Sequence, residues 1–475
     1  MIKSKLKIFI LLPDGVSLRN FAYTSFYALG KQKGFDIIFW NMTPFDLDKL
    51  EVSNIEITRP KIHWFTNILK SACKRIELKK YASRENDSIY FEYNFPLKIN
   101  SFKKLFKSFL IWLYSKMYAS EIGILKIREK IINNERKTNY YKDCLNVLRN
   151  EKPDFVFCTS QRSGESIAPL SAAADLGILT ASFIFSWDNI PKATTVVNTN
   201  FYFVWSDLMK TQLLHYQTYI KPEQIRVTGT PQFEHHFDKS NRQTREAFFE
   251  MYNLDLSKKY ICFSGDDITT SPNDELYLRD LAKSIVELNN QGADLGIIFR
   301  RCPVDFSDRY DKIISDYQQI IIPIDPLWEN VGGNWNKIMP TKDDLILQTN
   351  IIIHTEFVVN LGSSMVFDYA CYNKPCAYIK YNYLNASKTA EEGVYVYDYV
   401  HFRSMPSKEA VVWLDNLEEF KDKIKLMLKG VPNTVDLAKI WYANINMEPS
   451  DLASQRILET IENSILNISV RKNNL

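Results

Sequence analysis

The sequence lacks any long uninterrupted hydrophobic run. Its first apolar stretch, residues 6–12, is stopped by Pro13, Asp14 and Gly15, and it is too short for an export signal or a membrane span. We therefore expect a cytoplasmic protein whose first buried strand is this stretch. The chain also lacks internal repeats and low-complexity tracts, and its net charge of +3 gives no support for nucleic-acid binding.

Metal-binding spacing is absent from the cysteines and histidines. The seven cysteines include no CxxC pair, and Cys158 and Cys262 lie in apolar runs, which predicts buried free thiols rather than disulfides or a metal site. The six histidines have no ligand spacing. His235 and His236 are adjacent, and they either contact phosphate or sugar or are ordinary surface residues. The acidic pair that begins at Asp266 lies in a predicted loop, where carboxylates are usually solvated, so we expect no metal ion.

The length of 475 residues favours two domains, and 45% apolar with 24% charged residues is ordinary for a globular protein. Short apolar runs alternate with helical stretches in both halves, which predicts an α/β fold with two doubly wound parallel sheets. The predicted strands are 6–12, 36–40, 154–159, 179–185, 200–205, 225–227, 259–263, 295–299, 319–324, 357–359 and 377–379. Residues 325–340 are predicted to be a loop. We expect an N-terminal Rossmann-like domain over 1–240 with a helical insertion at about 51–150, a second Rossmann-like domain over 241–436, and a helical tail over 437–475 that packs back across the domains.

Residues 357–379 are the stretch around which the chain is organised, and in them a strand, a small-residue turn, a helix and a second strand are predicted to follow one another. The turn contains Asn360, Gly362, Ser363 and Ser364, and the helix carries Asp368. Glycine lets the backbone approach a ligand, and serine groups at a helix N-terminus favour phosphate. Asp368 then lies where it accepts hydrogen bonds from a sugar diol. The alternative is an ordinary N-capped helix with a surface aspartate.

In the first half, two loops follow predicted strands and should lie at the carboxyl edge of the sheet. In the loop 14–20, Gly15 and Ser17 can approach phosphate or sugar and Arg19 can pair with an anion. The alternative is a plain turn in which Ser17 or Asn20 caps the next helix. A second loop, 186–189, follows the strand at 179–185.

Residues 101–120 interleave aromatic and aliphatic side chains with four lysines. An amphipathic helix lying on an anionic membrane surface has this pattern, and we expect contact with the inner face of the cell membrane through this stretch. A helix docked on its own domain, with lysine ammonium groups reaching the solvent, has the same pattern.

The order of several short motifs resembles that of bacterial GT-B glycosyltransferases of surface-polysaccharide assembly, such as capsule, lipopolysaccharide and O-antigen. The segments that carry the resemblance are 13–21, 186–189, 299–303, 325–328, 339–340 and 359–365 with Asp368 and 374–375. It covers most of the chain outside 51–150, and it implies two Rossmann-like domains facing each other across a cleft. Two positions depart from the pattern, because Cys302 stands where relatives carry histidine and Asp368 replaces a glutamate.

The resemblance implies that a nucleotide sugar, of unknown base, is the donor substrate and that neither a cofactor nor a metal is required. The diphosphate of the nucleotide sugar would lie at Ser363 and Ser364, and its ribose would contact Asp368. Arg300 would neutralise the charge of the leaving phosphate. The other expected donor-binding residues are Asn360, Gly362, Ser264 and Gly265.

A glycan or a lipid-linked molecule would be the acceptor, contacted by Gly15, Ser17, Arg19, Asn20, Trp187 and Asn189. The candidate general bases are Asp188 and Asp14. We prefer Asp188, because the neighbouring indole of Trp187 would desolvate its carboxylate.

Four other functions stay open at this point. The same fold supports a nucleotide-sugar epimerase or a polyol-phosphate transferase, although the latter would normally use a histidine where this chain has Cys302. A non-catalytic nucleotide-binding module and a membrane-surface scaffold are the remaining alternatives.

Overall fold

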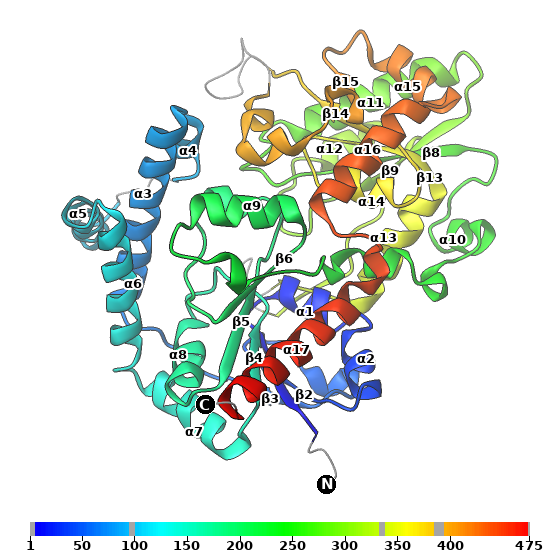
Figure 1. The fold of residues 1–475 in the computed structure, drawn as a ribbon. Helices are drawn as coiled ribbons and strands as arrows, with labels where there is room; N and C mark the ends of the chain where they lie inside the picture. The colour runs from blue at the N-terminus through cyan, green and yellow to red at the C-terminus, as the bar shows by residue number, and fades with distance from the viewer. Residues whose placement is uncertain (1–4, 95–99, 332–337, 384–393, 474–475) are drawn as a thin grey trace. The chain divides into compact units, whose positions relative to one another are not determined.

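The computed structural model describes residues 5–94, 100–331, 338–383 and 394–473 (Figure 1). The chain forms two compact units, of which unit 1 is Met1–Pro231 with Ile445–Leu475 and unit 2 is Gln232–Asn444. Each unit is built around a parallel β-sheet covered by helices.

The sheet of unit 1 has seven strands within the described residues, in the order β3-β2-β1-β4-β5-β6-β7, and all neighbours run parallel. The strands are β1 (Lys7–Leu12), β2 (Asp36–Asn41), β3 (Asn54–Glu56), β4 (Phe155–Cys158), β5 (Leu179–Phe183), β6 (Phe201–Val204) and β7 (Ile225–Val227). This is the predicted Rossmann-like arrangement, with β3 added at one edge.

Both faces of this sheet are buried, which is why its strands read as continuous apolar runs. Phe9 of β1 belongs to a core formed with helices on one face, whereas Phe157 of β4 points to the other face and packs edge-on against Phe21, with ring centroids 5.6 Å apart. The helices around the sheet are α1 (Gly15–Phe21), α2 (Phe26–Gln32), α8 (Ile167–Asp175), α9 (Asp207–Tyr216) and α17 (Ala453–Asn473).

A helical segment separates β3 from β4, where the sequence analysis placed an insertion. Its helices are α3 (Thr66–Glu85), α4 (Ile89–Glu92), α5 (Phe102–Met117), α6 (Glu121–Glu135) and α7 (Asn139–Glu151). Helix α3 packs against both α5 and α6. Arg128 of α6 is buried and donates to the backbone oxygens of Thr195 and Val197 at 2.7 and 3.1 Å, which ties the segment to the loop after β5.

The predicted loop 14–20 is helical, and this corrects the sequence analysis. Asp14 is the N-cap of α1, because its Oδ1 accepts from the Ser17 backbone N–H at 2.9 Å and from the Ser17 hydroxyl at 2.8 Å. The cap is therefore Asp14 rather than Ser17 or Asn20. Aspartate is a preferred N-cap residue, but Gly15 directly after it disfavours a helix, so the sequence did not indicate that a helix begins here.

Unit 2 repeats the topology of unit 1. Its described strands are in the order β10-β9-β8-β13-β14-β15, again all parallel. They are β8 (Lys259–Ser264), β9 (Leu295–Arg300), β10 (Ile321–Pro323), β13 (Thr355–Asn360), β14 (Cys376–Ile379) and β15 (Val412–Leu414). Phe263, Phe299 and Val359 face a core shared with α11 and α15.

The helices of unit 2 are α10 (Arg245–Met251), α11 (Asp274–Asn289), α12 (Asp311–Asp316), α13 (Lys342–His354), α14 (Met365–Ala370), α15 (Phe420–Lys429) and α16 (Pro432–Ile445). The predicted loop 325–340 instead contains two antiparallel strands, β11 (Trp328–Asn330) and β12 (Ile338–Pro340). Residues 332–337, between these strands, lie outside the described part of the chain.

Helix α17 belongs to unit 1, where it lies along α2 (Figure 1). Arg456 anchors its first turns, because the guanidinium donates to the carbonyl oxygens of Thr228, Met447 and Pro449 at 2.7, 3.0 and 2.9 Å. Asn446 adds a bond by accepting from the Thr230 N–H at 2.9 Å. None of the helices among the described residues is long and apolar enough to cross a membrane.

Replacing Arg456 with alanine should destabilise unit 1, because three carbonyl oxygens lose a charged donor at once. We expect a loss of about 3 kcal/mol in the free energy of unfolding, measured by urea titration with circular dichroism. Lys33→Ala is the control, because it removes the exposed ion pair between Lys33 and Glu459 of α17 and should cost less than about 0.5 kcal/mol. Equal effects of the two substitutions would contradict this account of the anchor.

Candidate functional site

The strand order of unit 2 marks one place at the carboxyl edge of its sheet. From β8 the chain runs outward to β9 and β10 on one side, whereas β13, β14 and β15 run outward on the other. Connections therefore diverge between β8 and β13, and ligands of such sheets bind where this occurs. Three predicted residues end the strands at this place: Ser264 on β8, Arg300 on β9 in register with Ser264, and Asn360 on β13.

Arg300 is buried and only partly satisfied. Its Nη2 donates to both carboxylate oxygens of Asp344 at 2.9 Å. Asp344 also accepts from the Leu327 N–H at 2.9 Å and from the Trp328 indole at 2.7 Å. Nη1 of Arg300 is buried and makes no hydrogen bond to any described residue. A guanidinium in this state can bind an anion through its second nitrogen.

The turn after β13 is stabilised by a hydrogen bond between its own residues. Asn360 is buried and its Oδ1 accepts from the Ser363 N–H at 2.9 Å, and Ser364 precedes α14 without a side-chain cap bond. Gly362 has φ +71°, and a Cβ there would lie 3.2 Å from the ring of Phe402 and 3.4 Å from that of Tyr397. Glycine at position 362 is thus required by its backbone conformation and by the aromatic rings packed beside it.

Asp368 is buried beneath this turn and bonded to a histidine. The His236 Nε2 lies 2.8 Å from its Oδ1, and the two side chains are 0% and 4% exposed. No described residue forms a hydrogen bond to Oδ2 of Asp368, or to Nδ1 of His236, which is buried. Asp368 is therefore not a surface residue. Its Oδ1 is hydrogen-bonded to His236, and its Oδ2 has no hydrogen bond to a described residue.

The turn after β8 is packed against two acidic groups. The Gly265 N–H donates to the Arg300 carbonyl at 2.8 Å, and a Cβ on Gly265 would lie 3.1 Å from the Tyr310 hydroxyl. Burial, with the negative charge of Asp274 adding to it, raises the pKa of Asp266 to about 8. Burial likewise raises the pKa of Asp274 to about 6. Among the described residues, no group of three or more histidine, cysteine, aspartate or glutamate side chains could hold a metal ion.

Unit 1 has the corresponding point of divergence between β1 and β4. Asp14 follows β1, and Gln161 and Arg162 follow β4. Burial raises the pKa of Asp14 above its ordinary value, opposed by hydrogen bonds from Ser17 and by the positive charge of Arg162. Of the predicted acceptor-side residues, Gly15, Ser17 and Asn20 are buried and Arg19 is half-buried.

Asp188 lies after β5 in a network of side chains. Its carboxylate forms an ion pair with Lys192 and accepts from the Asn189 amide at 2.8 Å. The Gln161 amide in turn donates to Asn189 at 3.2 Å. Trp187 is buried beside it, as the base hypothesis required, but Lys192 already occupies one carboxylate oxygen. The loop thus joins Asp188 and Asn189 to the end of β4.

The sequence did not predict which residues form hydrogen bonds with the predicted site residues. Asp344 lies 44 residues from Arg300, and His236 lies 132 residues from Asp368. His236 was predicted only as one of an adjacent histidine pair. Gln161 carries a weak signal, since it lies two residues after the predicted strand 154–159, and Lys192 carries one because it stands four residues after Asp188.

No protein-family model matches the sequence, and no curated protein matches it. Solved structures do match over nearly the whole chain. A Rickettsia africae glycosyltransferase is 13% identical with a TM-score of 0.53, covering 98% of this chain and 99% of its own. The UDP-GlcNAc 2-epimerase of Methanocaldococcus jannaschii is 15% identical with a TM-score of 0.51, covering 96% and 99%. Staphylococcus aureus MnaA, solved with UDP, is 12% identical with a TM-score of 0.51, covering 96% of both chains.

This is the GT-B fold. The sequence predicted this fold class, with two Rossmann-like domains. The similarity to the Rickettsia africae glycosyltransferase extends along both units of the chain. At these identities the match establishes the architecture of the chain.

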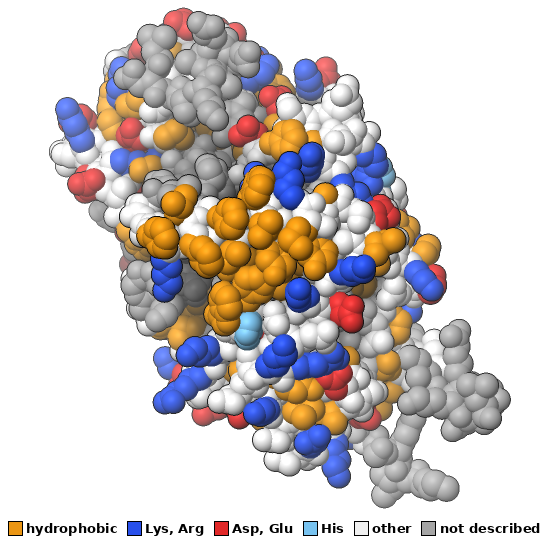
Figure 2. Space-filling model, turned by 90° about the vertical axis from the view of Figure 1, so that its left-hand side faces the viewer, with side chains coloured by type: hydrophobic (Ala, Val, Ile, Leu, Met, Phe, Trp, Pro, Cys, Tyr) orange, Lys and Arg blue, Asp and Glu red, His pale blue; other side chains and the backbone are white. Residues whose placement is uncertain are grey.

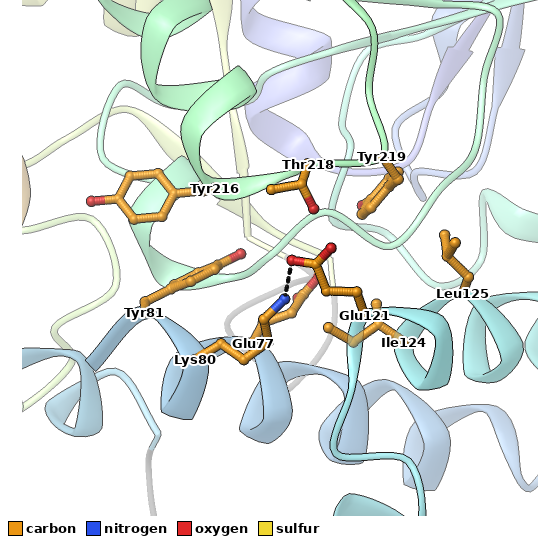
Figure 3. A pocket seen from close by; sticks show the side chains of 9 residues that line it. All are labelled: Glu77, Lys80, Tyr81, Glu121, Ile124, Leu125, Tyr216, Thr218 and Tyr219. Atoms are coloured by element: carbon orange, nitrogen blue, oxygen red, sulfur yellow. Dashed lines mark hydrogen bonds and ion pairs between the residues drawn. The ribbon is translucent and has the colours of Figure 1, made fainter. Parts of the chain in front are cut away.

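A small pocket of about 160 Å³ lies in unit 1 of this GT-B chain, lined by helices α3 and α6 and by residues at the end of α9 and just after it (Figure 3). Tyr81, Tyr216 and Tyr219 line it together with Glu77, and an ion pair of 2.6 Å between Lys80 and Glu121 borders it. None of the predicted site residues is among the residues that line it. Glu77 is 3% exposed, and burial raises its pKa to about 7 despite the positive charge of Arg128.

The raised pKa of Glu77 predicts that stability falls as pH rises. The folded state binds this proton more tightly than the unfolded state, so stability is lost between pH 4.5 and about 7. Glu77→Gln removes the titration. The unfolding temperature, measured by scanning fluorimetry at pH 5 and pH 8, should therefore decline less in the variant than in the wild type. An identical decline would contradict the assignment of this proton to Glu77.

Proposed function

We propose that the protein is a glycosyltransferase that transfers a sugar from a nucleotide-sugar donor, with unit 2 binding the nucleotide. The observation that carries the proposal is Arg300. A buried guanidinium with an open Nη1 ends a strand beside the point where the chain connections of the sheet diverge. An anion bound there would complete its hydrogen bonding, and a diphosphate leaving group needs such a charge in the transition state.

The neighbouring residues fit the other parts of a nucleotide sugar. The open Oδ2 of Asp368 is positioned by His236 to accept from a ribose hydroxyl, while Oδ1 stays held. Ser363 and Ser364 would offer hydroxyl and N–H groups to phosphate, with Asn360 fixing their turn. Ser264 and Gly265 would border the same ligand from β8. The MnaA structure of this fold contains UDP, so UDP-sugars are the first donors to test, and neither cofactor nor metal is assigned.

We assign the general base to Asp14 in preference to Asp188. Deprotonating an acceptor hydroxyl requires a carboxylate with raised basicity and an accessible oxygen. Burial raises the pKa of Asp14, and both hydrogen bonds from Ser17 reach Oδ1. The carboxylate of Asp188 instead pairs with Lys192, which would have to be displaced first. Trp187, Asp188 and Asn189 then serve to shape the acceptor side, together with Arg19.

The acceptor is proposed to be a glycan or a lipid-linked molecule of cell-surface polysaccharide synthesis, on the resemblance of the motifs at 13–21, 186–189 and 359–365. A nucleotide-sugar epimerase is the second candidate, because the solved UDP-GlcNAc 2-epimerase of Methanocaldococcus jannaschii shares the fold. An epimerase would use the same donor residues, so nucleotide binding alone does not separate the two functions.

The first test is the binding of UDP by purified protein. UDP should raise the unfolding temperature of the wild type, and isothermal calorimetry should give a dissociation constant that Arg300→Ala weakens by at least tenfold. Losing one charged hydrogen bond to phosphate accounts for a change of about this size. Arg300→Lys keeps the charge and should retain part of the affinity.

The matched control for this test is Arg301→Ala. Arg301 is the next residue in the chain, and its guanidinium donates to the Ser307 carbonyl and pairs with Asp311. Affinity for UDP should be unchanged in this variant. Equal affinity of the wild type and Arg300→Ala, or the absence of binding for UDP and for GDP, CDP and dTDP, would remove Arg300 from the proposed donor site.

Turnover separates the two candidate enzymes and tests the base. Incubation with UDP-sugars, followed by proton NMR, should show UDP release with hydrolysis or transfer of the sugar, whereas an epimerase would yield a new UDP-sugar. Asp14→Asn should lower kcat by about 10²-fold or more while leaving UDP affinity unchanged. Asp188→Asn should have a smaller effect, and the reverse order of the two variants would assign the base to Asp188.

A further inference from the structure

Helix α5 presents its apolar side to the solvent. Phe102, Phe106 and Phe109 are 84%, 53% and 51% exposed. In the same helix only Ile111 and Ser115 are buried. At 100° per residue the exposed rings fall on one side of the helix, and the two buried residues fall on the opposite side. A helix at the surface of a globular protein normally buries its apolar stripe, so α5 is inverted.

The exposed residues form one surface, which we call the α5 face: Trp64, Phe102, Leu105, Phe106, Phe109, Trp112 and Met117. The ring centroids of Phe109 and Trp112 lie 6.1 Å apart in a stacked arrangement. Trp64 joins the surface through Phe65, which packs on Trp64 at 4.9 Å and on Tyr114 of α5 at 5.2 Å. Figure 2, which views the side of the molecule that carries α5, shows a broad hydrophobic patch there. A contiguous patch of this kind marks an interaction site.

The charge on this helix has one sign. Lys103, Lys104 and Lys116 are exposed and Lys107 is half-buried, and the helix contains no aspartate or glutamate. None of these four lysines forms an ion pair with a carboxylate of the described residues. Lysine and arginine side chains also border the hydrophobic patch in Figure 2. An occupant of the α5 face must therefore accept aromatic side chains in its centre and present negative charge at the border.

We propose that the α5 face binds the surface of a lipid bilayer that contains anionic headgroups. Aromatic rings partition into the boundary between headgroups and acyl chains, and flexible lysines reach the phosphates above it. The rod of α5, about 24 Å long for its 16 residues, would lie parallel to the bilayer. This inference does not depend on the proposed function, because it concerns lipid binding without substrate.

The test is flotation of the full-length protein with vesicles of phosphatidylcholine, with and without 30% phosphatidylglycerol. The wild type should float with the anionic vesicles and bind the neutral ones at least fivefold less. Raising the salt concentration from 0.1 to 0.5 M should reduce binding, because the lysine contribution is screened.

Two variants separate the apolar and the charged contributions. The triple variant Phe106→Ser, Phe109→Ser, Trp112→Ser should bind anionic vesicles at least tenfold less than the wild type. The triple variant Lys103→Gln, Lys104→Gln, Lys107→Gln should lose the preference for anionic vesicles. Circular dichroism should show unchanged helix content and unfolding temperature in both, because the replaced side chains are exposed or half-buried and none of them belongs to the hydrophobic core of unit 1.

The controls replace exposed apolar side chains and lysines elsewhere on the chain. Leu426→Ser with Ile440→Ser removes two side chains that are 47% and 50% exposed, and Lys423→Gln, Lys425→Gln, Lys429→Gln removes three lysines of α15. Both controls should float like the wild type. The proposal is overturned if the wild type binds neither vesicle, if the α5 variants bind as the wild type does, or if the serine variant only abolishes a dimer seen by light scattering.

Discussion

Parallel strand pairing is the constraint on which the rest of this structure depends. Every strand pair in the two large sheets is parallel, so each connection must return over a face of the sheet. Both faces are then buried, and the carboxyl ends of all strands share one edge. In the sheet of unit 1 this edge carries Asp14 and Gln161, and in the separate sheet of unit 2 it carries Ser264, Arg300 and Asn360. Residues distant in sequence become neighbours there because each one ends a strand.

The same constraint explains which parts of the fold could be predicted. A strand buried on both faces, such as Phe155–Cys158 (FVFC), is a short apolar run, so the central strands and the residues that end them were recognisable. Among the edge strands of three residues, β7 and β10 were predicted, whereas β3, which has one apolar residue, and β15 were missed. The partners of the site residues were beyond reach, because His236 meets Asp368 only through packing across 132 residues. The helix at Asp14 was missed for a different reason, since Gly15 disfavours helix while the aspartate cap outweighs it.

The buried polar pairs of unit 2 are poorly explained by stability. Removing Arg300 and Asp344 from water costs free energy, and a buried ion pair is often no more stable than apolar residues of the same size. Here Asp344 has donors from Leu327 and Trp328 in addition to Arg300, whereas Nη1 of Arg300 has no partner among the described residues. A fold optimised for stability alone would satisfy that nitrogen or replace the arginine. A ligand that completes the network when it binds accounts for both observations.

An equivalent argument applies to the exposed side of α5. The core of unit 1 on this face of the sheet is formed by Ile68, Ile76, Ile124 and Ile127 with others of α3, α6, α7 and α8, and α5 adds only Ile111 to the buried set. Polar residues in place of Phe102, Phe106, Phe109 and Trp112 would leave this core intact and would improve solubility. The aromatic side chains are therefore not required for folding. Because exposing them is unfavourable in water, their presence on one side of a lysine-rich helix is best explained by an environment other than water.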